Sequence, residues 1–318
     1  MARYVKISTI GYSLINVDES LSNRGARVKM ETYISGQIAQ VLPDRPDLIL
    51  LPEMCDVPRN YDVARRLEYI RERGDANVRY FAEIAAANKC NIAFCTYRFG
   101  AGDYTLNTMY VLNRDGSIAG HYNKNHIVIP SELDKNVRCG TEAPIIELDI
   151  GRIACAICFD LNFDKIRTHY QALKPDIILF SSMYHGGIVQ QFWAQLCRAY
   201  FVGAISDSRP SAIISPLGEI LAYTTNYNNH VTATVNLDYE LAHVDYHAEK
   251  FVNLKKKYGP DVSIIDPGNI GYYMLTSECA GVTIAEMFEE FGIKTLDDYL
   301  DGAFAAHGLP ENRCLPED

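Results

Sequence analysis

The sequence has no long apolar run. No stretch approaches the roughly 18 continuous apolar residues that a membrane-spanning helix needs, so we expect no membrane partner. The apolar run near the start, in "MARYVKISTIGYSLI", is too short for a signal peptide and is followed by no small-residue cleavage site. These absences predict a cytoplasmic protein.

The chain also lacks a regular cysteine framework and a surplus of positive charge. Its nine cysteines are spread from Cys55 to Cys314, and an odd number favours free thiols in a reducing compartment. The formal net charge is −10, whereas a nucleic-acid-binding protein normally shows a basic patch. A disulfide-rich scaffold is therefore excluded, and we expect no nucleic-acid partner.

The sequence does contain a regular alternation of short apolar runs and helix-periodic segments. Of its 318 residues 48% are hydrophobic, which is enough for a sizeable core. Over residues 1–238 the alternation continues without a repeat or a linker, and it predicts an α/β unit of one mixed sheet, or of two sheets, covered by helices. Residues 239–318 are richer in charge, and we expect helices and loops there. This extension either wraps a partner subunit or forms a surface layer on its own subunit.

Two segments place a charged residue directly after an apolar strand, where α/β folds gather their sites. In "LILLPE", Glu53 ends a strand of the kind that is buried on both faces, and partial desolvation would suit it as a general base. In "HYNKNHIVIPSE", Lys124 could stabilise a developing oxyanion and Glu132 could hold that lysine in place. Taken alone, Glu53 is better explained as an ordinary strand-end carboxylate facing water, and the lysine segment is weak evidence because most lysines are solvated surface groups.

A third segment, "IACAICFDLNFD" at residues 153–164, holds two cysteines in a C-x-x-C arrangement. Cys158 follows an apolar strand and precedes a helix, so exposed backbone N–H groups and the positive helix end would favour a thiolate. Cys155 lies three residues earlier, and an odd offset along a strand points its side chain to the opposite face. We therefore predict that Cys158 is a nucleophile and Cys155 a small buried hydrophobe; a redox couple is the alternative.

In this order and spacing the three segments resemble the nitrilase superfamily of carbon–nitrogen hydrolases. The matching pieces are "DLILLPE", "HYNKNHIVIPSE" and "IACAICFDLNF", and the later stretches "PDIILFSS", "WAQLCRAYFVGAISDS" and "SPLGEIL" extend the resemblance over about residues 4–238. The resemblance implies a four-layer α-β-β-α sandwich of two mixed sheets. It also implies a homodimer or a higher homo-oligomer.

The resemblance further implies a catalytic triad of Glu53, Lys124 and Cys158, with Glu132 as the family's second glutamate. In that scheme Cys158 attacks a small amide or N-carbamoyl compound, while Lys124 and the backbone N–H of Phe159 stabilise the oxyanion. A thioester forms, ammonia or an amine leaves, and water releases the acid. No cofactor is implied.

The residues after the nucleophile favour an amide substrate over a nitrile. Cys158-Phe159-Asp160 is typical of amide-cleaving relatives, whereas nitrile-cleaving relatives tend to carry Trp-Glu after the cysteine. Many amidase-like relatives continue with an arginine, but this chain has Asn162, Phe163 and then an acidic residue. If that arginine normally binds a substrate carboxylate, this enzyme either recognises a different head group or binds the carboxylate elsewhere. The departure therefore counts against dicarboxylate monoamides and N-carbamoyl amino acids without excluding them. A nitrilase and a catalytically idle binding protein remain the alternatives.

Two further pairs of residues attract attention in the sequence. Tyr184 and His185 in "SSMYHGG" follow another strand and could line the substrate pocket, with simple turn formation as the alternative. His121 and His126 flank the candidate lysine at H-x₄-H spacing. That segment reads as strand and loop without a cysteine or carboxylate at zinc-site spacing, so we expect no metal.

We predict that the two cysteines of the C-x-x-C segment react at very different rates. Cys158 should be alkylated by iodoacetamide much faster than Cys155, because only Cys158 is placed at a strand end. Mass spectrometry of peptides from partly alkylated protein measures the difference. Equal rates, or a disulfide that forms readily between the two, would favour the redox alternative.

Overall fold

The computed structural model describes residues 2–207 and 210–314. The chain divides into two compact units, one of residues 5–235 and one of residues 1–4 with 236–318. All the candidate site residues lie in the first unit. Within the described ranges no helix is both long and apolar enough to cross a bilayer.

The first unit contains two six-stranded sheets, and the first has the order β12-β1-β2-β3-β4-β5. Its strands are β1 (Tyr4–Ile10), β2 (Leu48–Leu50), β3 (Asn91–Phe99), β4 (Thr105–Leu112), β5 (Ile118–Asn123) and β12 (His230–Asn236). β1, β2 and β3 run parallel, and β4 and β5 continue the sheet with antiparallel pairing. β2 and β5 therefore end at the same edge, which is where Glu53 and Lys124 follow them.

The second sheet has the order β11-β10-β9-β8-β7-β6. Its strands are β6 (Ile146–Leu148), β7 (Gly151–Ile157), β8 (Ile177–Ser182), β9 (Tyr200–Ile205), β10 (Ala212–Ile214) and β11 (Ile220–Tyr223). β7, β8 and β9 are parallel, and the outer pairs are antiparallel. The chain leaves β7 directly at Cys158.

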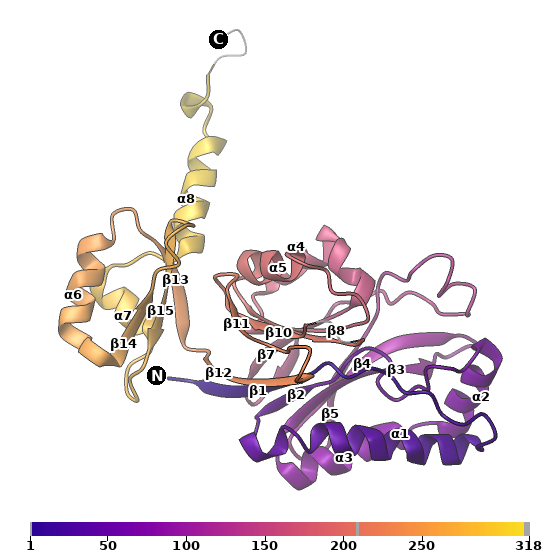
Figure 1. The fold of residues 1–318 in the computed structure, drawn as a ribbon. Helices are drawn as coiled ribbons and strands as arrows, with labels where there is room; N and C mark the ends of the chain where they lie inside the picture. The colour runs from indigo at the N-terminus through magenta and orange to yellow at the C-terminus, as the bar shows by residue number, and fades with distance from the viewer. Residues whose placement is uncertain (1, 208–209, 315–318) are drawn as a thin grey trace. The chain divides into compact units, whose positions relative to one another are not determined.

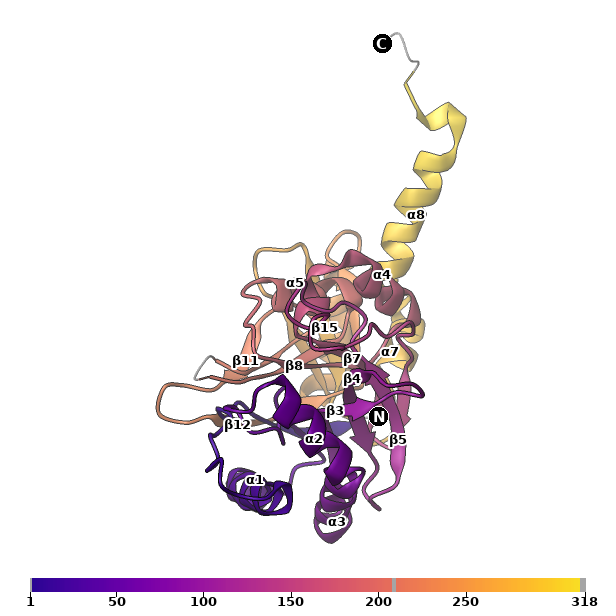
Figure 2. The same cartoon turned by 90° about the vertical axis from the view of Figure 1, so that its right-hand side faces the viewer.

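Helices cover the outer face of each sheet (Figure 1, Figure 2). The first sheet carries α1 (Asn23–Ile38), α2 (Val63–Arg73) and α3 (Ala76–Asn88), and the second carries α4 (Asp164–Leu173) and α5 (Val189–Cys197). Between the sheets, Thr9 Oγ1 donates to the carbonyl of Gly203 at 2.8 Å and Ser181 Oγ to that of Leu51 at 2.7 Å. The predicted α-β-β-α sandwich of two mixed sheets is confirmed.

The second unit contains a three-stranded antiparallel sheet of order β13-β15-β14. Its elements are β13 (Tyr239–His243), α6 (Ala248–Tyr258), β14 (Val262–Ile265), β15 (Tyr272–Ser277), α7 (Ile284–Phe291) and α8 (Leu296–Gly308). The expectation of helices and loops for residues 239–318 was therefore wrong about the strands. Each strand has only four to six residues, too few to show a clear alternation among the charged segments around it.

Candidate active site

The structure brings Glu53, Lys124 and Glu132 together in a buried cluster. Lys124 Nζ lies 3.2 Å from Glu53 Oε1 and 2.9 Å from Glu132 Oε2, and less than a tenth of each side chain is exposed. Glu53 follows β2, Lys124 follows β5, and Glu132 lies on the loop after Lys124. Three separate segments therefore converge at one edge of the first sheet.

Lys124 carries a positive charge in this cluster. Burial alone would lower its pKa, but the negative charges of Glu53, of a Cys158 thiolate and of Glu132 outweigh burial and raise the pKa of Lys124 above its ordinary value. With both carboxylates ionised, one ammonium faces two negative groups. The cluster then has one net negative charge while Cys158 is a thiol.

Further donors hold both carboxylates in place. Asn107 Nδ2 donates to Glu53 Oε1 at 2.8 Å and lies 3.5 Å from Glu132 Oε1. The backbone N–H of Met183 donates to Glu53 Oε2 at 3.1 Å, and that of Val128 donates to Glu132 Oε2 at 2.7 Å. Every carboxylate oxygen thus has a donor, as buried charges require.

Asn107 and Tyr97 belong to this cluster, although sequence reasoning missed them. Tyr97 Oη lies 3.5 Å from Glu132 Oε1. Asn107 is only 1% exposed in β4, a strand that is buried along nearly its whole length. A carboxamide inside such a strand needs a buried partner, and this was the signal that could have found Asn107.

Cys158 lies where β7 ends and the five-residue 3-10 helix η2 (Cys158–Asn162) begins. Its φ of 48° is a left-handed conformation that residues other than glycine rarely adopt. Such strain persists only where the surrounding contacts impose it, and it is common at active sites. The side chain is 9% exposed and lines the same pocket as Glu53 and Lys124.

Cys158 is a thiol at neutral pH. Burial and then the charge of Glu53 raise its pKa to about 12, although Lys124 and a hydrogen bond with Ser182 act in the opposite direction. The expected thiolate is therefore not the resting form of Cys158, because burial and the charge of Glu53 raise the pKa. A base must remove this proton, and Glu53 is the adjacent carboxylate.

Cys155 lies in a different environment. It is fully buried within β7, paired with Leu179 of β8, and burial raises its pKa. Its neighbours Ala154 and Ala156 pack toward α4 and α5, so Cys155 points to the opposite face of the sheet. Both Cys155 and Cys158 are free thiols.

Asp160 connects the turn at Cys158 to the segment that carries Lys124. Its buried carboxylate accepts from the backbone N–H of His126 at 2.8 Å and from Tyr122 Oη at 2.7 Å, and it lies 3.1 Å from His126 Nδ1. It also accepts from the backbone N–H of Ile157 at 3.2 Å. One carboxylate thereby fixes the separation of the lysine and cysteine segments.

A pocket of about 350 Å³ opens beside these groups. Its volume is at the lower end of the range of about 300–1,000 Å³ for small-ligand sites. Phe159, Tyr184 and His185 are not among the described residues that line it. Phe159 contacts Phe163 edge to face, and Tyr184 Oη lies 3.4 Å from Asn162 Oδ1. A contact of these three residues with substrate stays a prediction.

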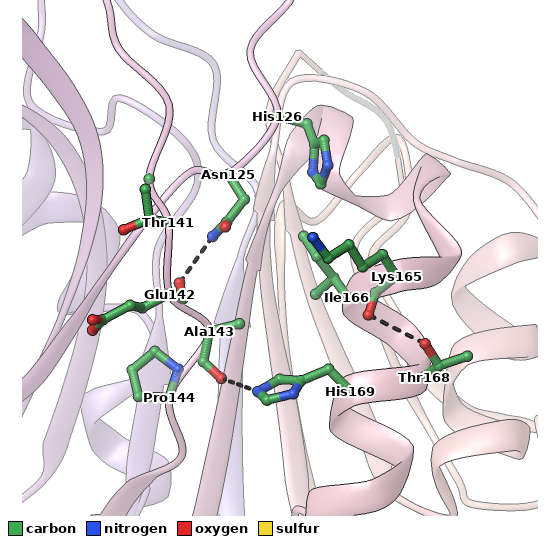
Figure 3. A pocket seen from close by; sticks show the side chains of 11 residues that line it. Asn125, His126, Thr141, Glu142, Ala143, Pro144, Lys165, Ile166, Thr168 and His169 are labelled. Atoms are coloured by element: carbon green, nitrogen blue, oxygen red, sulfur yellow. Dashed lines mark hydrogen bonds between the residues drawn. The ribbon is translucent and has the colours of Figure 1, made fainter.

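A second and wider pocket, of about 960 Å³, lies between residues 140–144 and α4. Figure 3 shows Asn125, which donates to the carbonyl of Glu142, and His169, which is bonded to the carbonyl of Ala143. None of the described residues that line this pocket is a cysteine. It is therefore not the candidate active site.

The sequence of this chain is similar to those of known proteins. A model of the carbon-nitrogen hydrolase family matches residues 25–243. The chain is 26% identical to the chloroplastic omega-amidase of Arabidopsis thaliana, over 59% of this chain and 58% of the length of that protein. It is also 26% identical to the 2-oxoglutaramate amidase of Bacillus subtilis, over 66% of this chain and 85% of that protein.

Solved structures share the fold at low sequence identity. The C. elegans NitFhit protein gives a TM-score of 0.65 at 17% identity, covering 82% of this chain and 65% of that one. An amidase from Nesterenkonia sp. gives 0.63 at 15% identity, covering 78% and 95%. A variant of an amidase from Nesterenkonia sp. AN1, with a TM-score of 0.63 at 14% identity over 80% and 96%, carries the acetamide moiety of fluoroacetamide on its active-site cysteine. These likenesses show the fold.

We predict that Asp160→Asn lowers the free energy of unfolding by about 1–3 kcal/mol, because a carboxamide cannot accept from every donor that faces it. Urea denaturation measures the change. Asp164→Asn is the matched control, since its side chain is 80% exposed and pairs only with Arg167. Equal stability of the two variants would contradict the role given to Asp160.

Proposed function

The chain belongs to the carbon-nitrogen hydrolase family, and we propose that it hydrolyses a small amide or N-carbamoyl compound through a thioester on Cys158. The observation that carries the proposal is that Glu53, Lys124 and Cys158 line one small pocket, with Lys124 between two carboxylates. The amidase activities named for similar proteins support it, as does the cysteine adduct of the Nesterenkonia enzyme.

In the first proposed step Glu53 takes the proton of the Cys158 thiol while the sulfur attacks the carbonyl carbon. The raised pKa of Cys158 makes this transfer necessary, and coupling it to the attack avoids a free buried thiolate. Lys124 and the backbone N–H of Phe159 donate to the carbonyl oxygen as negative charge develops there. Removing a donor of this kind typically costs about two to three powers of ten in rate.

The remaining steps restore the thiol. The tetrahedral intermediate collapses, the C–N bond breaks, and Glu53 returns its proton to the leaving ammonia or amine, which leaves a thioester on Cys158. Glu53 then takes a proton from water as the water attacks the thioester, and the acid is released. In this scheme Glu132 exchanges no proton: it holds Lys124, whose raised pKa keeps it charged throughout.

The proposal also covers the domain bounds, the location and the assembly of the protein. We assign residues 1–238 to the hydrolase domain and 239–318 to an extension, in a cytoplasmic homodimer or higher homo-oligomer. Cys158-Phe159-Asp160 favours an amide over a nitrile, as the family resemblance implies.

We predict that Cys158→Ala abolishes ammonia release from every compound in a panel of amides, N-carbamoyl compounds and nitriles. The wild-type protein, quenched in acid during turnover, should show an acyl adduct by intact-mass spectrometry, mapped to Cys158 by peptide analysis. Cys155→Ala is the matched control and should keep both turnover and adduct, because its thiol is fully buried within β7 and its pKa is shifted by burial, with no contribution from Glu53 or Lys124.

Two results would overturn this assignment. One is near-normal turnover by Cys158→Ala protein, and the other is an adduct that maps to Cys155. Ammonia release from nitriles but not from amides would replace the amidase proposal with a nitrilase.

A further inference from the structure

The candidate active-site pocket is lined by three cationic side chains besides Lys124, namely Arg59, Arg66 and Lys135. Arg59 has a counter-ion, because its Nη1 lies 2.9 Å from Asp207 Oδ1. The other two come from separate elements, Arg66 from α2 and Lys135 from the loop that carries Glu132. We therefore ask what balances the charges of Arg66 and Lys135.

Arg66 makes only neutral contacts within the described part of the chain. Its Nη2 donates to the carbonyl of Tyr61 at 3.3 Å, and its guanidinium carbon lies 5.8 Å from the ring centre of Tyr97. Its Nε is buried and has no hydrogen-bond partner among the described residues. A buried donor without a partner costs free energy, so this guanidinium is not held by a full set of protein acceptors.

Lys135 is also without a counter-ion. Its ammonium makes no hydrogen bond or ion pair in residues 2–207 and 210–314, and only its backbone N–H is bonded, to the carbonyl of Glu132. The neighbouring acids Asp62 and Asp134 form no ion pair with Lys135 or Arg66 within the same ranges. The pocket wall thus carries two positive side chains that form no ion pair among the described residues.

We propose that Arg66 and Lys135 bind a carboxylate on the acyl part of the substrate, so that the enzyme selects amides whose acyl group is anionic. This inference rests on the proposed amide hydrolysis at Cys158. Arginine and lysine bind carboxylates by charge-assisted hydrogen bonds, which are stronger in a partly buried pocket than in water. In this proposal the cations that bind the carboxylate come from α2 and from the loop of residues 130–137. An arginine after Cys158-Phe159-Asp160 is then not needed for that contact.

The test compares two amides of nearly the same size and shape. Succinamate has a carboxylate opposite its amide, and 4-oxopentanamide has a neutral methyl ketone in that place. Ammonia release gives kcat/KM for each, and the ratio of the two values isolates recognition of the charge. We expect the wild-type enzyme to prefer succinamate, and Arg66→Gln and Lys135→Gln each to lower the ratio by about 10- to 100-fold.

One further variant, and a comparison of the first two, make the result specific. Arg65→Gln removes a neighbouring arginine on α2 that does not line the pocket and should leave the ratio unchanged. Arg66→Gln also removes the hydrogen bond from Arg66 to the carbonyl of Tyr61, so its effect could come from a change of structure. Lys135→Gln removes no such bond, because the Lys135 side chain has no partner in the described structure.

A wild-type ratio near one, or a ratio that neither variant lowers, overturns the proposal while leaving amide hydrolysis intact. If neither amide is turned over, the proposed hydrolysis fails for these two compounds. The anion site is then tested separately, by calorimetric binding of both amides to Cys158→Ala protein. Tighter binding of succinamate that Arg66→Gln and Lys135→Gln abolish supports the site, and equal binding of the two amides overturns it.

Discussion

The ion pairs of Lys124 with Glu53 and Glu132 are the constraint on which the rest of the site depends. An ammonium and two carboxylates are buried together, and removing one partner from such a set typically costs about 3–5 kcal/mol because the others lose their compensation. The chain satisfies this requirement by ending β2 and β5 at the same sheet edge and by returning the loop to Glu132. Asn107 and two backbone N–H groups complete the bonding.

The second sheet brings Cys158 to this cluster. β7 ends at Cys158 in a left-handed conformation, and the buried carboxylate of Asp160 bonds both to Ile157 and to the segment around Lys124. The thiol is therefore delivered to Glu53 in its protonated form, with a raised pKa. Under the proposed mechanism the high pKa is useful, because deprotonation occurs only when a carbonyl carbon is in position to receive the sulfur.

Much of this arrangement could be predicted from residue order alone, and the failures have physical causes. Glu53, Lys124 and Cys158 were singled out because each follows an apolar strand, and Glu132 because it lies in a motif that resembles the family's. Asn107 was missed because hydrophobic periodicity says nothing about one polar residue inside a strand.

The end of one helix and the presence of another could not be predicted from the sequence, for local reasons. The end of α5 at Cys197 depends on Arg198, which turns to a φ of 55°, and on β9, which begins at Tyr200. α2 was not predicted at all: its sequence "VARRLEYIRER" is so charged that only Tyr69, Ile70 and Arg73 are buried. Arg66, which lines the pocket, was missed for the same reason, since the sequence pattern does not distinguish an arginine on a charged helix from a surface group.

The central claim is that Glu53 and Lys124 serve Cys158 as one unit, and a double-mutant cycle on kcat/KM tests it most directly. Glu53→Gln, Lys124→Met and the double variant are assayed with one amide substrate. Residues that act as a unit give losses that do not multiply, so the double variant should be about as slow as the slower single variant. Losses that multiply, or a single variant with near wild-type kcat/KM, would contradict the account.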